Sequence, residues 1–127
     1  MNGIERYAAV LRQERPDKIP LRVGNYNMFI CQYYGITVQD YLNDPALNAE
    51  LLVRFAEDFN FDSIKPGLGY ILYGCGPEMG PQWKFVENDF PGCVKGVIDT
   101  PEDIEKVEIP AEPTGYFHNF LEINRRV

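Results

Sequence analysis

Apolar residues recur at helical spacing through the middle of the chain. After Asp44 they fall three or four positions apart, at Ala49, Leu52, Val53, Ala56 and Phe59. Asp44 is a favoured N-cap residue, and Pro45 suits the first position of a helix. The pattern therefore predicts an amphipathic helix over residues 45–59 with these five side chains turned inward.

Two short apolar runs flank this helix and predict strands. Residues 61–65 are too short for a helix and are closed by Pro66 and Gly67, and residues 19–24 form a similar run earlier in the chain. A helix that packs on a sheet and leads directly into a short strand is half of a βαβ unit. We therefore expect an α/β protein.

The remaining elements are shorter. Before the main helix, we expect a first helix over 3–13, a helical turn over 28–34 and a short helix that begins after Thr37 and runs through Leu42. After it, we expect two hairpin strands over 83–86 and 93–99, joined by a turn at 88–92, and a short helix after Thr100. The last expected helix covers 115–127, with Phe117, Phe120, Leu121 and Ile123 turned inward. In an α/β chain such a last helix is normally followed by another parallel strand, so we expect an incomplete fold.

Composition narrows the possible functions. The 127 residues suffice for one domain, and a net charge of −7 with scattered basic residues argues against binding to nucleic acid. No run of about 18 apolar residues predicts a membrane span, and the charged first residues do not resemble a secretory signal. We therefore expect a cytoplasmic protein. Three cysteines without CxxC spacing indicate neither a disulfide framework nor a local zinc knuckle.

Catalytic motifs are scarce. The sequence contains no GxSxG, P-loop or HExxH pattern. We interpret His118 as a surface or boundary residue, and Cys75, in a glycine-rich stretch without a nearby basic partner, as an inert thiol. No catalytic residue and no metal ligand is therefore assigned to this chain.

Topology gives a better indication of a site than motifs do. In parallel sheets and barrels, ligands bind where strands give way to the following loops. Here those positions are residues 24–27 and 65–70, and the candidates for ligand contact are Asn25, Asn27, Lys65 and Tyr70. The alternative interpretation is that the asparagines form Asx turns and that Lys65 is a solvated strand end.

Several stretches together resemble the uroporphyrinogen decarboxylase superfamily. In chain order they read ERPDKIPL, GITVQDYLNDPALNAELLVRFAEDFNFDSIKP, CGPEMG and VIDTPEDIEKVEIP. The resemblance covers nearly the whole chain, and it is closest to the branch of corrinoid-linked methyltransferases, which includes methylcobamide:coenzyme M methyltransferases and O-demethylase methyltransferases.

The resemblance implies a TIM (β/α)8 barrel, a fold of about 250 residues. Residues 1–127 would then form one partial domain: leading helices, the first two barrel strands, a hairpin excursion over 79–99 and a terminal helix over 115–127. Such a chain is expected to be a fragment, a truncated reading frame or one half of a split enzyme, and to need the missing barrel half or a homo-oligomer.

The family's decarboxylases bind the tetrapyrrole through arginines after the first strand and an aspartate after the second. The matching stretches here read RVGNYNMF and IKPGLGY, so Asn25 and approximately Gly67 stand where Arg and Asp would be. The resemblance therefore implies methyl transfer to or from a small molecule and a corrinoid protein, with tetrapyrrole decarboxylation as the alternative.

The methyltransferase branch binds zinc through a His-x-Cys pair and a later Cys in the second half of the barrel. Residues 1–127 do not contain this pattern. The resemblance thus implies zinc and a corrinoid protein for the full-length family but no cofactor bound by this chain alone, which we expect to be inactive by itself. A further alternative is a complete, non-catalytic module that binds a small ligand or another protein.

Overall fold

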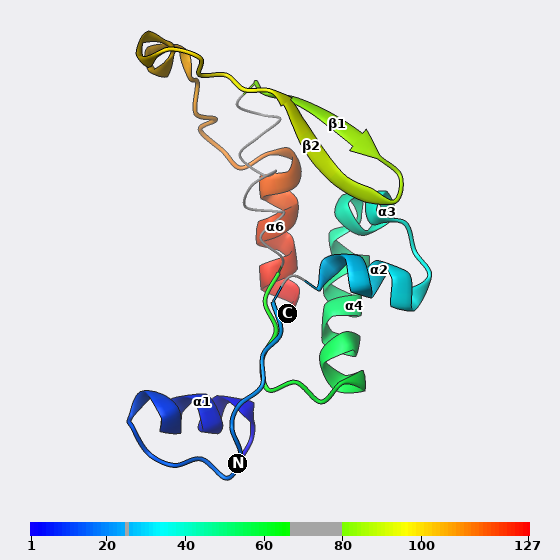
Figure 1. The fold of residues 1–127 in the computed structure, drawn as a ribbon, viewed down its shortest axis with the longest axis vertical. Coiled ribbons are helices and arrows are strands. Elements are labelled where there is room, and N and C mark those ends of the chain that lie inside the picture. Colours follow the sequence, from blue (N-terminus) through cyan, green and yellow to red (C-terminus); the bar gives the residue numbers. More distant parts are fainter. Residues whose placement is uncertain (25, 67–79) are drawn as a thin grey trace.

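The computed structural model describes residues 1–24, 26–66 and 80–127. Figure 1 shows an elongated arrangement, with α1 (Gly3–Leu11) at one end and a two-stranded hairpin towards the other. Between them lie α2 (Asn27–Tyr34), α3 (Val38–Asn43), α4 (Pro45–Asp58) and α6 (Gly115–Arg126). The mixture of helices and a small sheet confirms an α/β chain; a closed barrel is not part of the described residues.

The central helix α4 begins where its sequence predicts. The Asp44 carboxylate accepts hydrogen bonds from the backbone N–H groups of Ala46 (2.9 Å) and Leu47 (3.0 Å), and Pro45 occupies the first turn. Two apolar positions depart from the prediction. Val53 is 36% exposed and Phe59, beyond the helix end, is 38% exposed.

The buried face of α4 is rotated relative to the predicted one. Its buried residues are Asn48, Ala49, Leu51, Leu52 and Phe55. The reason is that α2 and α3 pack on one side of α4 and α6 on another, so Leu51 and Phe55 face neighbouring helices while Val53 does not. The spacing identified the helix correctly, but not which neighbours would cover it.

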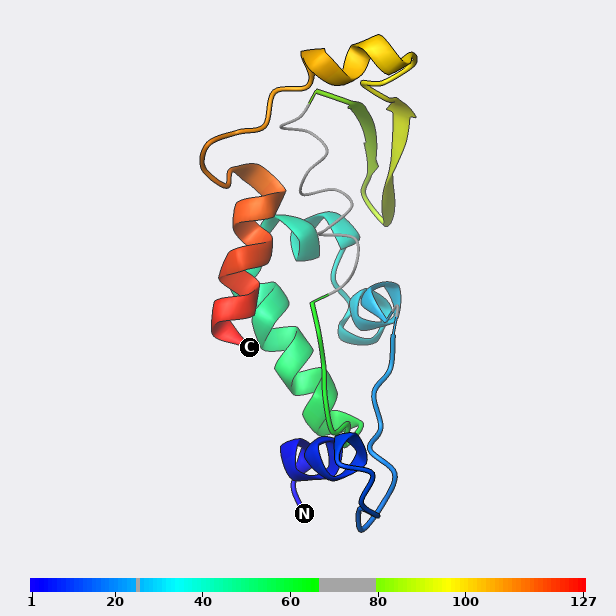
Figure 2. The same cartoon turned by 90° about the vertical axis from the view of Figure 1, so that its left-hand side faces the viewer.

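The core lies among these four helices. Figure 2 shows α4 and α6 side by side, with Ile123 of α6 fully buried. Phe117, Phe120 and Leu121 are half-buried, and His118 is exposed, as expected for a surface residue. The Thr37 hydroxyl accepts a hydrogen bond from the Asp40 N–H (3.0 Å), which confirms the predicted start of α3.

The hairpin forms with a tighter turn than predicted. β1 (Gln82–Val86) pairs antiparallel with β2 (Asp89–Lys95), with Trp83 opposite Cys93. Residues 89–92, which the sequence predicts as turn, lie in β2, where Asp89 pairs with Val86 and Gly92 with Lys84, and the strand ends at Lys95 rather than at residue 99. Asp, Pro and Gly are typical turn residues, but pairing with β1 overrides that local preference, and register shifts accompany the pairing.

A ring contact and a backbone hydrogen bond are among the contacts that connect the hairpin to the helices. The ring of Phe85 stacks on that of Tyr116 in α6, with centroids 5.7 Å apart, and the Gln39 N–H donates to the Glu87 carbonyl (3.2 Å). Beyond β2, the 3₁₀ helix η2 (Pro101–Lys106) begins directly after Thr100, as predicted. The Thr100 N–H donates to the Asp103 carboxylate (2.9 Å).

The two predicted barrel strands are extended segments rather than regular strands. Residues 19–24 and 61–65 form one isolated parallel bridge, between Arg22 and Ser63. Pro20 has no N–H to donate to a ladder, which restricts pairing in the first segment. The parallel orientation agrees with the prediction, whereas the length of the strands does not.

Candidate functional site

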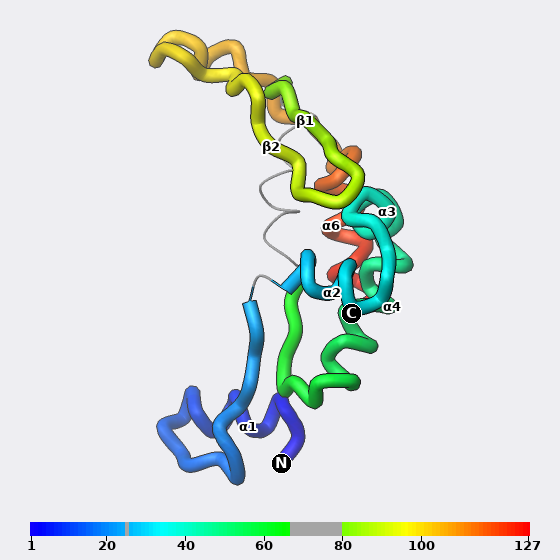
Figure 3. The backbone as a smooth tube through the Cα atoms, turned by 45° about the vertical axis from the view of Figure 1, so that its right-hand side comes forward, coloured from blue at the N-terminus to red at the C-terminus, as the bar shows by residue number. Residues whose placement is uncertain are grey.

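The two extended segments run side by side between α1 and the helical core, as Figure 3 shows. Besides the bridge between Arg22 and Ser63, the Asp62 N–H donates to the Leu21 carbonyl (2.9 Å). Because the segments are parallel, their amino ends face α1 and their carboxyl ends face α2. Each end is closed by a different set of side chains.

Charged groups close the amino end. The Arg6 guanidinium donates to Asp17 (Nε to Oδ1, 2.7 Å) and to Asp62 (Nη1 to Oδ1, 2.7 Å), and the Leu21 N–H donates to the second oxygen of Asp62 (2.9 Å). The Asp62 side chain is only 4% exposed. We call Arg6, Asp17 and Asp62 the ionic junction.

The pKa values of both carboxyl groups in the ionic junction lie below their usual range. The backbone N–H of Leu21, followed by the guanidinium of Arg6, lowers the pKa of Asp62, and Arg6 lowers the pKa of Asp17. Gly3 also fits closely here, since a β-carbon at that position would lie 2.2 Å from the Asp62 carbonyl oxygen. The ionic junction therefore serves to attach α1 to the segments.

Neutral hydrogen bonds close the carboxyl end. The Lys65 N–H donates to the Tyr26 hydroxyl (2.8 Å), and that hydroxyl donates to the Lys65 carbonyl. The Tyr26 ring packs on Phe55 of α4, with centroids 5.4 Å apart. Burial raises the pKa of the Tyr26 phenol. Tyr26 therefore connects the start of α2 to the end of the second segment. We call Tyr26 and the backbone of Lys65 the tyrosine clamp.

The candidates for ligand contact that the sequence predicts do not include Tyr26. Its hydroxyl nevertheless bonds to the backbone of Lys65, 39 residues away. The available signal was its place directly after the first segment, where side chains can reach the neighbouring segment end.

The predicted ligand contacts fall only partly within the described residues. Asn27 begins α2 and is buried, and its side-chain oxygen accepts a hydrogen bond from the Tyr41 hydroxyl (3.3 Å). Lys65 is half-buried beside the tyrosine clamp. Asn25 and Tyr70 lie outside the described residues, as does Gly67. The four-residue ligand site thus stays a prediction.

The cysteines and the histidine do not converge. Cys31 is buried in α2, where burial raises its thiol pKa to about 11, Cys93 is exposed in β2, and His118 is exposed in α6. Across residues 1–24, 26–66 and 80–127, no three His, Cys, Asp or Glu side chains are placed to hold a metal ion. The described part of the chain does not fit a zinc centre. Cys75 lies outside it.

The fold and the site define an α/β chain with two parallel segments whose carboxyl ends meet a helical core. A comparison with protein families matches residues 2–127 to the uroporphyrinogen decarboxylase family, to which this chain therefore belongs. No curated protein matches the chain, and no solved structure does. Among the described helices, none combines the length and apolar character needed to cross a membrane.

Proposed function

We propose that this chain forms the first part of a (β/α)8 barrel that transfers a methyl group between a small molecule and a corrinoid protein. The observation that carries the proposal is the chemistry of the two carboxyl ends. No arginine occurs between Arg22 and Arg54, and no aspartate occurs between Asp62 and Asp89. The groups with which the family's decarboxylases bind a tetrapyrrole are therefore missing from both loops.

The position of Asp62 supports this interpretation. It is the aspartate nearest to the end of the second segment, but it belongs to the ionic junction at the opposite end and is already bonded to Arg6 and Leu21. It cannot bind pyrrole nitrogens from there. A tetrapyrrole with several carboxylates also needs several cations, whereas Asn27 is uncharged and Lys65 is the one cation among the four proposed contacts.

The parallel bridge supports the barrel. A parallel pair requires a crossover connection, and here the connection between Arg22 and Ser63 contains α2, α3 and α4. In a barrel of this type the ligand binds at the carboxyl ends of the strands. We accordingly retain Asn25, Asn27, Lys65 and Tyr70 as the proposed contacts with the methyl donor or acceptor.

The zinc ion of the proposed enzyme would be bound by residues other than those that the structure describes. In this reaction class, zinc converts a coordinated thiol to a thiolate or polarises the methyl donor. Because the described side chains do not fit a zinc centre, we derive no catalytic step for them. The proposed contribution of this chain is binding and positioning, and a second polypeptide or further barrel strands would supply the metal.

The test combines one binding measurement with one reaction. The chain is titrated with uroporphyrin and, separately, mixed with methylcobalamin, a thiol acceptor and the zinc-carrying half of a methyltransferase of this family. We expect no uroporphyrin binding, no demethylation by the chain alone, and demethylation by the mixture above the level of the zinc-carrying half alone. Uroporphyrin binding without methyl transfer would favour the decarboxylase alternative. The absence of both uroporphyrin binding and methyl transfer would favour a non-catalytic module.

A further inference from the structure

Arg22 and Lys65 project from the same face of the two parallel segments. The bridge sets Arg22 opposite Ser63, and side chains alternate between the two faces of extended backbone. Val23 and Ile64, which follow the bridged residues, pack against the helical core. Arg22 and Ser63 therefore point away from the core, and so does Lys65, two residues after Ser63. In the proposed barrel this face lines the interior, because the helices form the outer ring.

The charge of Arg22 acts at the carboxyl end of the second segment. Burial raises the pKa of the Tyr26 phenol, and the Lys65 backbone together with the positive charge of Arg22 offsets part of that rise. Because the Tyr26 hydroxyl bonds to the backbone of Lys65, the guanidinium lies near the same segment end. Lys65 follows Ser63 by two residues, or about 7 Å along the segment, a distance that two long side chains can span.

Neither of these two cations is neutralised by a described side chain. Arg22 is exposed and Lys65 is half-buried, and neither forms an ion pair with another described residue. The one carboxylate of the two segments, Asp62, belongs to the ionic junction and is already bonded to Arg6 and Leu21. Two neighbouring positive charges repel each other, and an anion between them relieves that repulsion.

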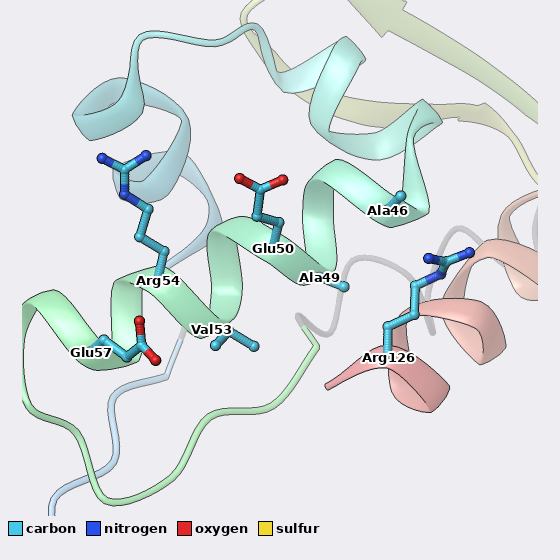
Figure 4. A pocket seen from close by; sticks show the side chains of 7 residues that line it. All are labelled: Ala46, Ala49, Glu50, Val53, Arg54, Glu57 and Arg126. Carbon is cyan, nitrogen blue, oxygen red and sulfur yellow. The ribbon is translucent and has the colours of Figure 1, made fainter.

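The groove between α4 and α6 has the opposite arrangement of charges. Figure 4 shows Arg54 on α4 together with Glu50 and Glu57, and Arg126 of α6 borders the same groove. The Arg126 Nε also lies 4.0 Å from the Glu122 carboxylate. An anion would therefore meet carboxylates in this groove, whereas the described side chains at the carboxyl ends of the segments offer two unpaired cations.

We propose that Arg22 and Lys65 bind one carboxylate of the small molecule that donates or accepts the methyl group. This inference rests on the proposed function, because it concerns the ligand of the same site. The planar guanidinium of Arg22 presents two parallel N–H donors to the two carboxylate oxygens, and the Lys65 ammonium adds a point charge. The Ser63 hydroxyl, on the same face, can donate a further hydrogen bond. Two cations suit a ligand with one carboxylate rather than a tetrapyrrole with several.

Direct binding to the full chain tests the proposal. The probes are benzoate and its neutral counterpart benzamide, and the readout is the NMR chemical shift of the backbone N–H groups of residues 63–65. At low salt, benzoate should bind at least about tenfold more tightly than benzamide. Arg22→Met and Lys65→Met should each raise the benzoate dissociation constant at least about fivefold and leave that of benzamide unchanged. Arg22→Lys should cause a smaller loss, because it keeps the charge but not the planar fork.

Arg15→Met is the matched control. Arg15 is an exposed cation outside both segments, so this variant changes the net charge equally and should leave benzoate binding intact. The melting temperature of each variant shows whether it is folded. Equal affinities for benzoate and benzamide, including no binding of either, or a benzoate affinity that neither substitution changes, would overturn the proposal. Benzoate binding that depends on both cations, without methyl transfer by the reconstituted mixture, would support the carboxylate site and count against the proposed function alone.

Discussion

The two ends of the parallel segments are held by opposite kinds of chemistry. At the amino end, the ionic junction joins three charged side chains from α1, the following loop and the second segment. At the carboxyl end, the tyrosine clamp uses one neutral hydroxyl against the backbone N–H and carbonyl of one residue. Satisfied charges therefore fix the amino end, whereas Lys65 at the carboxyl end has no structural ion pair among the described residues.

The largest effect is expected from Arg6→Met. Removal of the guanidinium leaves the Asp62 carboxylate, with its largely buried side chain, without its closest charge partner, and α1 loses its main attachment. We expect the melting temperature to fall by on the order of 10 °C. The control is Arg12→Met, because the pair that Arg12 makes with Glu14 is exposed and contributes little. Equal melting temperatures for the two variants would contradict this role of the junction.

A change of pH should separate the two ends. The pKa values of Asp17 and Asp62 are lowered in the folded chain, so their contribution to stability is present above the unfolded pKa of about 4 and is lost as pH falls through the folded values. The Tyr26 pKa is raised, so its contribution is present below about pH 10 and is lost as pH rises.

Hydrogen exchange and chemical denaturation at a series of pH values measure whether the two ends lose stability in different pH ranges. Below about pH 4, Leu21 and α1 should lose protection before the N–H of Lys65 does, and above about pH 10 the order should reverse. In a plot of the free energy of unfolding against pH, Arg6→Met should reduce the slope at acid pH and leave the slope at alkaline pH unchanged. A single pH profile shared by both ends would show that they do not act independently.

Tyr26→Phe is expected to have a smaller effect than Arg6→Met. The substitution keeps the ring on Phe55 but leaves the N–H and the carbonyl of Lys65 without their partner, at a cost of about 2 kcal/mol in the free energy of unfolding. Tyr33→Phe is the matched control, because Tyr33 lies in α2, the helix that Tyr26 precedes, and is 52% exposed. Urea denaturation of both variants provides the measurement, and an unchanged midpoint for Tyr26→Phe would contradict the clamp.

Local signals predicted the elements well. Asp44 with Pro45 and Thr37 with Asp40 act over a few residues, so the starts of α4 and α3 could be located from the sequence. Residues 89–92 could not be assigned correctly, because pairing with β1 overrides their turn preference. Val53 likewise lies in the predicted helix, but its side chain is exposed, because burial depends on the neighbouring helices.

The contacts that close the segments could not be predicted in the same way. Arg6 and Asp62 are 56 residues apart, and Tyr26 and Lys65 are 39 apart. Neither periodicity nor capping rules act over such distances, and both pairs depend on the parallel approach of two segments that hydrogen-bond through a single bridge. Asn27 and Lys65 were located at a carboxyl end by topology alone, and that reasoning did not foresee that Tyr41 would bond to Asn27.

The smallest effect on stability is expected from Lys65→Met. The clamp uses only the backbone of Lys65, so replacement of its side chain should change the free energy of unfolding by less than about 0.5 kcal/mol. If the ammonium instead contacts the proposed small-molecule ligand, the rate of methyl transfer in the reconstituted mixture should fall. Lys95→Met, at the end of β2, is the matched control for both measurements. A loss of stability as large as that of Tyr26→Phe would mean that the Lys65 side chain supports the fold. The Lys65 ammonium would then not be free to bind a ligand at the carboxyl end.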